Sequence, residues 1–493
     1  MLNHGMFSQF NVYLRTHFFR SYMRRIYTTF FSLLVCTFEV ISQSPVVDDP
    51  WMKFTHLTKD DGLSNNYILD FLQDHKGYMW IATLDGLNRY DGYSFTTFKQ
   101  NPEDPASLSN NLVTCLAETF DSVLWIGTRS GLNFYNHHTQ NFKIAAELFP
   151  DSEELANSHI RAMLADDDLL WVETAQGKLF KINLESGDVT SFSHHPPSMV
   201  NTYYYHDILK MPDGKLLLGG RYMGLWVFDP KTEEIRIIRN DPNDPAKKRD
   251  EDVAFYFIDS QGTFWVGGID GLYSFDIDSE IFEKHLSVSS FSMVEPLADE
   301  LWIAAGSGLF KYNTAAKKFI NTQHNDNIFQ SLSHNHINKL YIDQSGNIWV
   351  GTLDGVNIFQ PSKNKFRHIF HIPENDNSPS SNHVTAISVD DKNRLWIGTE
   401  DKGLECFNLN WERLYTYAES APYPFKLNSN SVSTLMIDSE GDVWVGQWSG
   451  RGFNIINPDK KTNRSLNLVK GELKADWYHD FLQDSKANFW TGI

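Results

Sequence analysis

The sequence predicts an all-β protein built from tandem β-propellers, and three observations support this fold class. A short motif recurs: MWIATLDGLNRYD at 79–91 returns as LWIGTRSGLNFYN at 124–136, and copies continue to FWTGI at 489–493. Most copies are 45 to 48 residues apart, a period typical of propeller blades. Each copy consists of short apolar runs between Gly, Asn and Asp turns, without a long amphipathic helix. The residues that mark the copies are Trp80, Trp125, Trp171, Leu217, Trp265, Trp302, Trp349, Trp396, Trp444 and Trp490.

One copy shows how a four-stranded blade is expected to form. Residues 67–74 and 79–83 read as the two inner strands, because their near-continuous apolar character suits burial on both faces. Residues 87–91 and 94–99 read as the outer strands, joined by tight turns. In the fourth copy Leu217 replaces the marker Trp, and we expect Trp226 of the third strand to fill the space.

The repeats divide into two predicted rings. Residues 53–58 resemble a fourth strand without a blade of its own, so we expect them to pair with the strand around Val356–Phe359 and close a seven-bladed propeller over 53–360. Residues 361–493 then hold the first three repeats of a second, incomplete propeller, and we expect the chain to be the front part of a longer protein. A single irregular ring of nine or ten blades is the alternative.

The N-terminus reads as a secretory signal. Arginines precede an apolar run at 26–38 that is too short to span a bilayer, and small and polar residues follow. We therefore predict a signal peptide over 1–43, with Met23 as an alternative start, and a linker over 44–52. The net charge of −19 disfavours nucleic acid as a partner. Cys115 lies in a strand-like run and reads as a core residue, and we expect no cofactor.

The repeat pattern D-x-x-G-x-[LIM]-W-[IV]-[GA]-T-x-x-G-L-x-x-[YF]-[DN] resembles the two-component regulator propeller repeat. The lead-in WMKFTHLTKDDGLSNNYI (51–68) is similar to the start of the sensor half of hybrid two-component system proteins. The resemblance covers about 51–493. It implies two seven-bladed propellers outside the inner membrane, then a β-sandwich, a membrane helix and a histidine kinase, and a homodimeric receptor that senses oligosaccharides. The sandwich, the membrane helix and the kinase signature are not found in this sequence.

Two sets of variable residues are expected to form a ligand-binding rim. One set stands just before the first strand of each blade and the other follows the second strand, so both should lie at the same end of the ring. Aromatic, amide, basic and acidic side chains there suit a sugar. Tyr204 is expected to be a stacking residue, whose change to Ala should weaken oligosaccharide binding at least tenfold. The candidates are Tyr67, Arg129, His159, Tyr204, Tyr205, His206, Arg221, Tyr222, Asp252, His336, His383, Trp448, Arg451 and Trp477.

Other interpretations remain open at this point. The rim residues could simply solvate the rim, and the propeller could be a scaffold or a secreted lyase or glycosidase acting on a polysaccharide. DQSGN (343–347) and DSEGD (438–442) faintly resemble calcium loops but stand where a turn between two strands is needed. His137 and His138 have no third ligand nearby in sequence, so we expect solvent-exposed histidines and no metal site.

Overall fold

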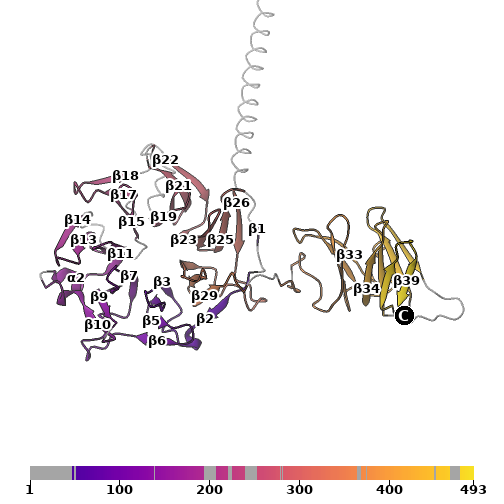
Figure 1. Ribbon diagram of the computed structural model, residues 1–493, viewed down its shortest axis with the longest axis horizontal. Coiled ribbons are helices and arrows are strands. Elements are labelled where there is room, and N and C mark those ends of the chain that lie inside the picture. The colour runs from indigo at the N-terminus through magenta and orange to yellow at the C-terminus, as the bar shows by residue number, and fades with distance from the viewer. Residues whose placement is uncertain are drawn as a thin grey trace, which may run out of the picture. The chain divides into compact units, whose positions relative to one another are not determined.

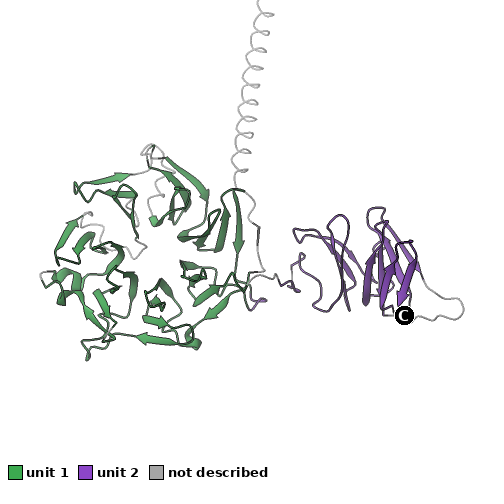
Figure 2. Ribbon diagram, viewed as in Figure 1, with its two compact units in different colours: residues 1–325, 330–365 green, residues 326–329, 366–493 purple. Residues whose placement is uncertain are grey.

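The computed structural model describes a nearly all-β chain that divides into two compact units (Figure 1, Figure 2). Unit 1 comprises residues 1–325 and 330–365, and unit 2 comprises residues 326–329 and 366–493. The predicted limits 53–360 and 361–493 remain predictions, and the signal peptide predicted over 1–43 lies outside the described residues. The structure describes residues 47–48, 52–137, 139–150, 152–193, 207–219, 225–238, 253–277, 279, 281–363, 368–373, 375–448, 451–466 and 478–492.

Unit 1 contains seven sheets that form the blades of one propeller. Blade 1 consists of β3 (Ile68–Gln73), β4 (Met79–Thr83), β5 (Gly86–Tyr90) and β6 (Phe95–Phe98). Blade 2 consists of β7 (Val113–Glu118), β8 (Leu124–Thr128), β9 (Gly131–Asn136) and β10 (Asn141–Ile144). Blade 3 consists of β11 (Ile160–Asp166), β12 (Leu169–Thr174), β13 (Lys178–Asn183) and β14 (Val189–Ser193). Blade 4 consists of β15 (Asp207–Lys210), β16 (Leu216–Gly219), β17 (Leu225–Phe228) and β18 (Ile235–Ile238).

The remaining three blades follow the same order. Blade 5 consists of β19 (Val253–Ile258), β20 (Phe264–Gly268), β21 (Gly271–Asp276) and β22 (Ile281–Leu286). Blade 6 consists of β23 (Ser290–Leu297), β24 (Glu300–Ala305), β25 (Gly308–Asn313) and β26 (Lys318–Thr322). Blade 7 consists of β27 (Ile337–Ile342), β28 (Ile348–Thr352) and β29 (Val356–Phe359), with β2 (Thr55–Leu57) as its outer strand. The helical turns of the described residues are η1 (Lys59–Asp61), η2 (Ala145–Glu147) and α2 (Glu153–Asn157).

The ring of unit 1 is closed by the N-terminal strand. β2 pairs antiparallel with β29, and the register joins Thr55 to Ile358 and Leu57 to Val356. The pairing expected from the sequence is therefore present. β1 (Val47–Asp48), within the segment expected to be a linker, adds a parallel strand to the outer edge of blade 6. The innermost strands β3, β7, β11, β15, β19, β23 and β27 each contact the next one, and β27 contacts β3 (Figure 1).

The core of unit 1 lies between the blades rather than at one centre. Its apolar residues fall into seven clusters, and each cluster joins two neighbouring blades. Trp80 of blade 1, for example, is fully buried with Leu116 and Ile126 of blade 2. The blades also meet closely at the glycine two residues after the marker Trp. A Cβ at Gly127 would lie 2.8 Å from Ile160 Cγ2 of blade 3, so a larger residue does not fit there.

The expected role of Trp226 is wrong. Leu217 pairs with Val227 and packs toward blade 5, whereas Trp226 pairs with Leu218 and packs toward blade 3. Neighbouring strand residues point to opposite faces of a sheet, so Trp226 cannot fill the space beside Leu217. The same cluster as Leu217 contains Phe264 of blade 5, which stands where the other blades of unit 1 carry Leu, Met or Ile.

Unit 2 contains two complete blades and a further pair of strands among its described residues. Blade 8 consists of β30 (Val384–Val389), β31 (Leu395–Thr399), β32 (Leu404–Phe407) and β33 (Arg413–Tyr417). Blade 9 consists of β34 (Val432–Ile437), β35 (Val443–Gln447), β36 (Phe453–Asn457) and β37 (Thr462–Leu466). The pair is β38 (Asp480–Gln483) with β39 (Phe489–Gly492). No helix in the described part of the chain has the length and apolar character needed to cross a membrane.

Candidate functional site: the rim of the first propeller

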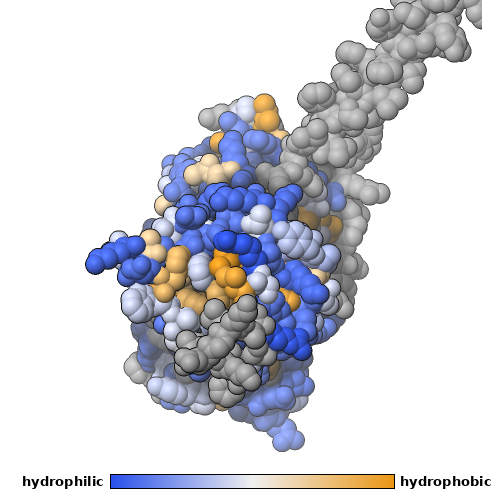
Figure 3. All heavy atoms as spheres, turned by 90° about the vertical axis from the view of Figure 1, so that its right-hand side faces the viewer, coloured by the Kyte–Doolittle hydropathy of each residue, from blue (hydrophilic) through white to orange (hydrophobic). Residues whose placement is uncertain are grey.

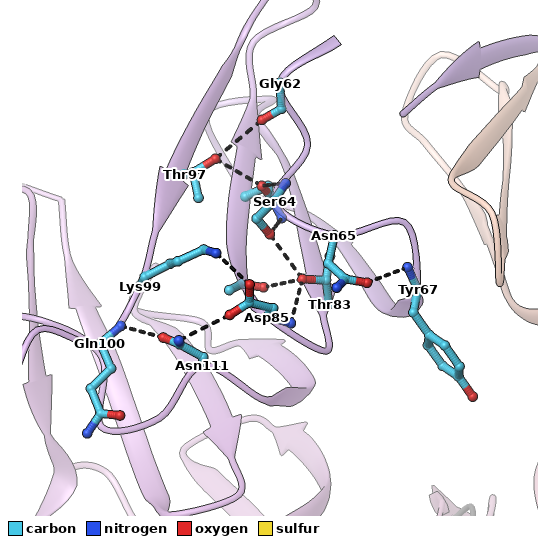
Figure 4. Close-up of polar contacts among 12 residues, drawn as sticks. Gly62, Ser64, Asn65, Tyr67, Thr83, Asp85, Thr97, Lys99, Gln100 and Asn111 are labelled. Carbon is cyan, nitrogen blue, oxygen red and sulfur yellow. Dashed lines mark hydrogen bonds and ion pairs between the residues drawn. The ribbon is translucent and has the colours of Figure 1, made fainter. Parts of the chain in front are cut away.

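A buried hydrogen-bond frame holds the loop that leads into the first strand of a blade. In blade 1, Ser64 N donates to Asn88 Oδ1 at 2.8 Å, and Ser64 Oγ lies 3.0 Å from Thr83 Oγ1 (Figure 4). The same frame joins Ser109, Thr128 and Asn133 in blade 2 and Ser333, Thr352 and Asn357 in blade 7. The three asparagines are fully buried. The loops therefore rest on a rigid support.

The sequence interpretation missed this frame. The sequence nevertheless contains its signal. Similar segments lead into the first strand of blades 1, 2 and 7, namely DGLSNNYI, ASLSNNLV and QSLSHNHI. The third strand of each of these blades contains the tripeptide GLN or GVN. The serine and the asparagine are 24 residues apart in each blade, so only an alignment of whole repeats brings them together.

The two predicted rim sets lie next to each other in blades 1, 2, 3, 6, 7, 8 and 9. The backbone N–H of the residue after the second strand donates to the backbone C=O of the residue before the first strand. These pairs are Leu84 to Tyr67, Arg129 to Leu112, Ala175 to His159, Gly306 to Ser289, Leu353 to His336, Glu400 to His383 and Trp448 to Ser431. Blade 6 thus contributes Ser289 to this position. Ser292 of β23 lies further along the strand, where it is buried and accepts a hydrogen bond from Leu340 N.

Half of the predicted site residues are described by the structure. Tyr67, His159 and His336 are partly buried, and Arg129 is exposed, all in unit 1. In unit 2, His383 lies 3.5 Å from Glu400, and Trp448 is half exposed. Arg451 forms an ion pair with Glu419 at 2.6 Å and lines an amide-rich pocket with Asn428, Asn454 and Asn463. Tyr204, Tyr205, His206, Arg221, Tyr222, Asp252 and Trp477 lie outside the described residues.

The structure brings two of the predicted residues together where blade 7 meets blade 1. Tyr67 precedes β3 and His336 precedes β27, and both side chains hydrogen bond to Asn338. Asn338 Nδ2 also donates to Ile68 O at 2.9 Å, which anchors the amide to the neighbouring blade. The ring of Phe291 lies 4.9 Å from that of His336. The Tyr67 ring points away from the buried frame of its own blade (Figure 4). We call Tyr67, Phe291, His336 and Asn338 the rim cluster.

Partial burial sets the charge state of the rim cluster. Burial raises the pKa of Tyr67, against the opposing effect of its hydrogen bond with Asn338. Burial and the nearby His334 lower the pKa of His336. Both side chains are therefore favoured in their neutral forms at neutral pH, in which each offers a hydrogen-bonding group and an apolar ring face.

The innermost strands carry charged groups that hold blades together. Lys339 Nζ lies 2.9 Å from Asp70 Oδ1, and Asp70 Oδ2 accepts a hydrogen bond from Leu116 N of blade 2. Asp207 accepts a hydrogen bond from Tyr256 N of blade 5. Burial raises the pKa of Asp207 to about 6. Each of these carboxylates thus bonds a backbone N–H of the next blade.

The two segments that faintly resembled calcium loops are turns, as expected. Asp343 Oδ1 accepts hydrogen bonds from Ser345 N and Asn347 N, and its Oδ2 accepts one from Trp349 Nε1. Asp438 bonds its own turn and Trp444 in the same way. The carboxylates of Asp343 and Asp438 therefore stabilise the turn between the first and second strands of their blades.

Comparison with known proteins gives a consistent picture of these blades. The family model described as "Two component regulator propeller" matches residues 62–85, 107–130, 331–354, 378–401 and 426–449. Each match runs from the loop before the first strand to the turn after the second strand of one blade. These five segments are two-component regulator propeller repeats.

Solved structures agree with this assignment. A crystal structure described as the extracellular domain of a hybrid two-component system from B. thetaiotaomicron is similar over 90% of this chain and 58% of that chain, at 27% identity and a TM-score of 0.70. A second such domain from the same organism shares the fold at 20% identity and a TM-score of 0.53, over 90% of this chain and 57% of that one.

A curated relative, "Histidine kinase P4" of Formosa agariphila, is 37% identical over 78 residues, which cover 16% of this chain and 6% of the relative. The two-component regulator propeller repeats described here thus span a small part of that kinase and less than two thirds of each of the two solved structures.

Proposed function

We propose that this chain is the extracytoplasmic ligand-sensing module of a two-component signalling receptor. The observation that carries the proposal is the similarity of 90% of the chain, at 27% identity, to an extracellular domain of a hybrid two-component system. The 37% identical relative, a histidine kinase, supports the same context. In this proposal the module passes its signal to a kinase part beyond residues 1–493, in a homodimeric receptor anchored by a membrane helix.

The location follows from residues 1–43 acting as an export signal. A fusion of these residues to an alkaline phosphatase, which is active only after export, is expected to give phosphatase activity in a Gram-negative host. Replacement of the apolar run at 26–38 with polar residues should abolish that activity. Equal activity of the two fusions would contradict the proposed signal.

The proposed ligand is an oligosaccharide bound at the rim. A sugar ring offers apolar C–H faces that stack on aromatic rings, and hydroxyls that exchange hydrogen bonds with amides and imidazoles. The rim cluster supplies rings from Tyr67, Phe291 and His336 and an amide from Asn338. It rests on three consecutive blades, 6, 7 and 1, so a ligand bound there would report on how these blades meet.

Calorimetric titration with a panel of oligosaccharides from plant and algal polysaccharides tests this assignment. For an oligosaccharide that binds, Tyr67→Ala should weaken the affinity at least tenfold, about 1.4 kcal/mol. Tyr93→Ala is the matched control, because Tyr93 is 97% exposed in the β5–β6 turn at the opposite end of the same blade. Binding that survives Tyr67→Ala unchanged would place the site elsewhere.

A secreted polysaccharide lyase or glycosidase is the second candidate. Such an enzyme needs side chains available for proton transfer or nucleophilic attack. Among the described residues, the carboxylates of Asp70 and Asp207 near the ring axis already bond backbone N–H groups of the next blade. Because these two carboxylates already accept hydrogen bonds from the backbone, the arrangement favours the sensor over the enzyme. Mass spectrometry of a binding oligosaccharide after incubation with the protein is expected to find it uncleaved, and shortened products would favour the enzyme.

A further inference from the structure

His137 has a buried, unused ring nitrogen. The sequence interpretation placed His137 in solvent without further ligands nearby, and this is wrong. Its Nε2 is buried and has no hydrogen-bond partner among the described residues. The Tyr135 ring stands 5.1 Å from the imidazole at 86° and helps to fix its orientation. A buried nitrogen lone pair or N–H without a partner costs free energy, so this one calls for a ligand.

Two further ligand-type side chains lie beside it. His75, in the β3–β4 turn of blade 1, has its ring 4.9 Å from that of His137 at 80°. His75 Nδ1 lies 2.6 Å from Glu118 Oε1, and the backbone N–H of His75 donates to both oxygens of Glu118. Glu118 ends β7 of blade 2. One potential ligand atom from each of the three residues lies within 4.8 Å of the others.

These groups match the preferences of one class of ligand. Two imidazole nitrogens and a carboxylate oxygen form the set that binds Zn²⁺ with one position left for water. We propose that His75, Glu118 and His137 form a divalent transition-metal site, with Zn²⁺ as the expected ion. The site joins the first turn of blade 1 to the ends of β7 and β9 in blade 2.

The metal requires the ligand atoms to move relative to one another by about 1.5 Å at most. Ligand atoms about 2.0 to 2.1 Å from a tetrahedral Zn²⁺ stand about 3.3 Å apart. His75 Nδ1 and Glu118 Oε1 would therefore separate by less than an ångström, and the proton shared between them would leave. Of the side chains involved, His75 is the more exposed and can rotate, whereas Glu118 is anchored by the backbone N–H of His75. Lys76 brings an opposing positive charge, but its side chain is exposed.

The position of the site separates it from the rim. His75 lies in the turn that follows β3, whereas Tyr67 precedes β3, so the two sites lie at opposite ends of blade 1. The metal would therefore clamp blades 1 and 2 without contacting the proposed ligand. Failure of oligosaccharide binding and failure of metal binding are independent outcomes.

Titration of the tag-free, EDTA-treated full chain with ZnCl₂, followed by calorimetry and thermal unfolding, tests the proposal. We expect one tight site per chain and a melting temperature raised by several degrees. His137→Gln and His75→Gln should each weaken zinc binding at least tenfold and remove the thermal shift. His368→Gln, which alters an exposed histidine of unit 2, should leave both unchanged.

Two outcomes would overturn the site. One is the lack of a stoichiometric zinc site in the wild-type chain, and the other is undiminished zinc binding by His75→Gln. Because His75 is exposed and its substitution should not unfold the chain, this variant decides the question even if His137→Gln fails to fold. The visible spectrum of the Co²⁺-loaded chain, compared with that of the variants, gives a second readout of ligation by imidazole.

Discussion

The aspartate six residues before a marker tryptophan has two structural roles. In six copies the Trp indole Nε1 donates to this aspartate, as Trp349 does to Asp343 at 2.9 Å. The other carboxylate oxygen accepts backbone N–H groups of the turn. The sequence predicts the turn and the buried tryptophan separately. The bond between them was not predicted, because it depends on how the turn folds back over the ring.

The first prediction concerns this pair. Asp343→Ala should lower the free energy of unfolding by about 2 to 3 kcal/mol, because the buried indole N–H and two turn N–H groups lose their acceptor. Asp343→Asn keeps an acceptor oxygen for the turn and should cost less. Denaturant unfolding of the two variants measures the difference. Equal losses would mean that the carboxylate charge, rather than its hydrogen bonds, matters.

The raised pKa of Asp207 predicts a pH dependence of stability. Burial raises this pKa from 3.8 to about 6, while Lys339 and the N–H groups of Tyr256 and Ile208 oppose the rise. The folded chain thus favours the protonated acid, and the stability that this gives is fully present below pH 3.8 and is lost as the pH rises through about 6.

Asp207→Asn cannot ionise and removes this contribution. Between pH 4 and 7 the free energy of unfolding should therefore fall more steeply for the wild type than for Asp207→Asn. Denaturant titrations at matched pH values measure both slopes. Parallel slopes would show that Asp207 titrates near its ordinary pKa in the folded chain.

At the scale of the blades, the sequence predicts the strands well but predicts poorly which side chains contact one another. Four strands per copy and the pairing of β2 with β29 follow from apolar runs, turn residues and the need to close a ring. The face on which a third-strand residue packs depends on the strand register, and this is why the role expected of Trp226 failed. The rim cluster combines residues of blades 1, 6 and 7, and its Asn338 bonds Ile68, 270 residues away, which periodicity within one copy cannot reveal.

The junction of blades 4 and 5 gives the third prediction. Phe264→Leu should leave a cavity beside Leu217 and cost about 1 to 2 kcal/mol. Leu217→Trp alone should also destabilise the chain, because the added ring meets Phe264 and its neighbours. The double variant restores the arrangement of the other junctions, so its loss should be smaller than the sum of the two single losses. Additive losses, measured by chemical unfolding, would show that the two side chains do not share a space.

At the scale of the whole molecule, the two units differ in how well their apolar surfaces are covered. Each junction of the seven blades of unit 1 has its own apolar cluster. In unit 2, Ile387 and Val389 of β30 are 63% and 58% exposed, and Leu482 and Trp490 are 62% and 61% exposed. Apolar side chains also stand among hydrophilic ones on the surface drawn in Figure 3. Such surfaces favour association.

The last prediction follows from this contrast. A chain of residues 44–360 should be more soluble and more monodisperse than one of residues 44–493, because it carries the closed ring without the exposed apolar strands of unit 2. Light scattering over a concentration series compares the two. Indistinguishable profiles would count against the prediction, and Ile387→Lys in the longer chain should move its behaviour toward that of the shorter one.

The pairing of β2 with β29 also sets an order of events during biosynthesis. The partners are about 300 residues apart, so β2 leaves the ribosome first and waits until nearly all of unit 1 has been made. Intermediate blades can form from local hairpins, but the ring locks only in a late, long-range step with a high entropic cost. Until then the outer edge of β29 is bare and open to a wrong partner. Closure is therefore expected to be the slow and error-prone step of folding, at which a chaperone would be most effective.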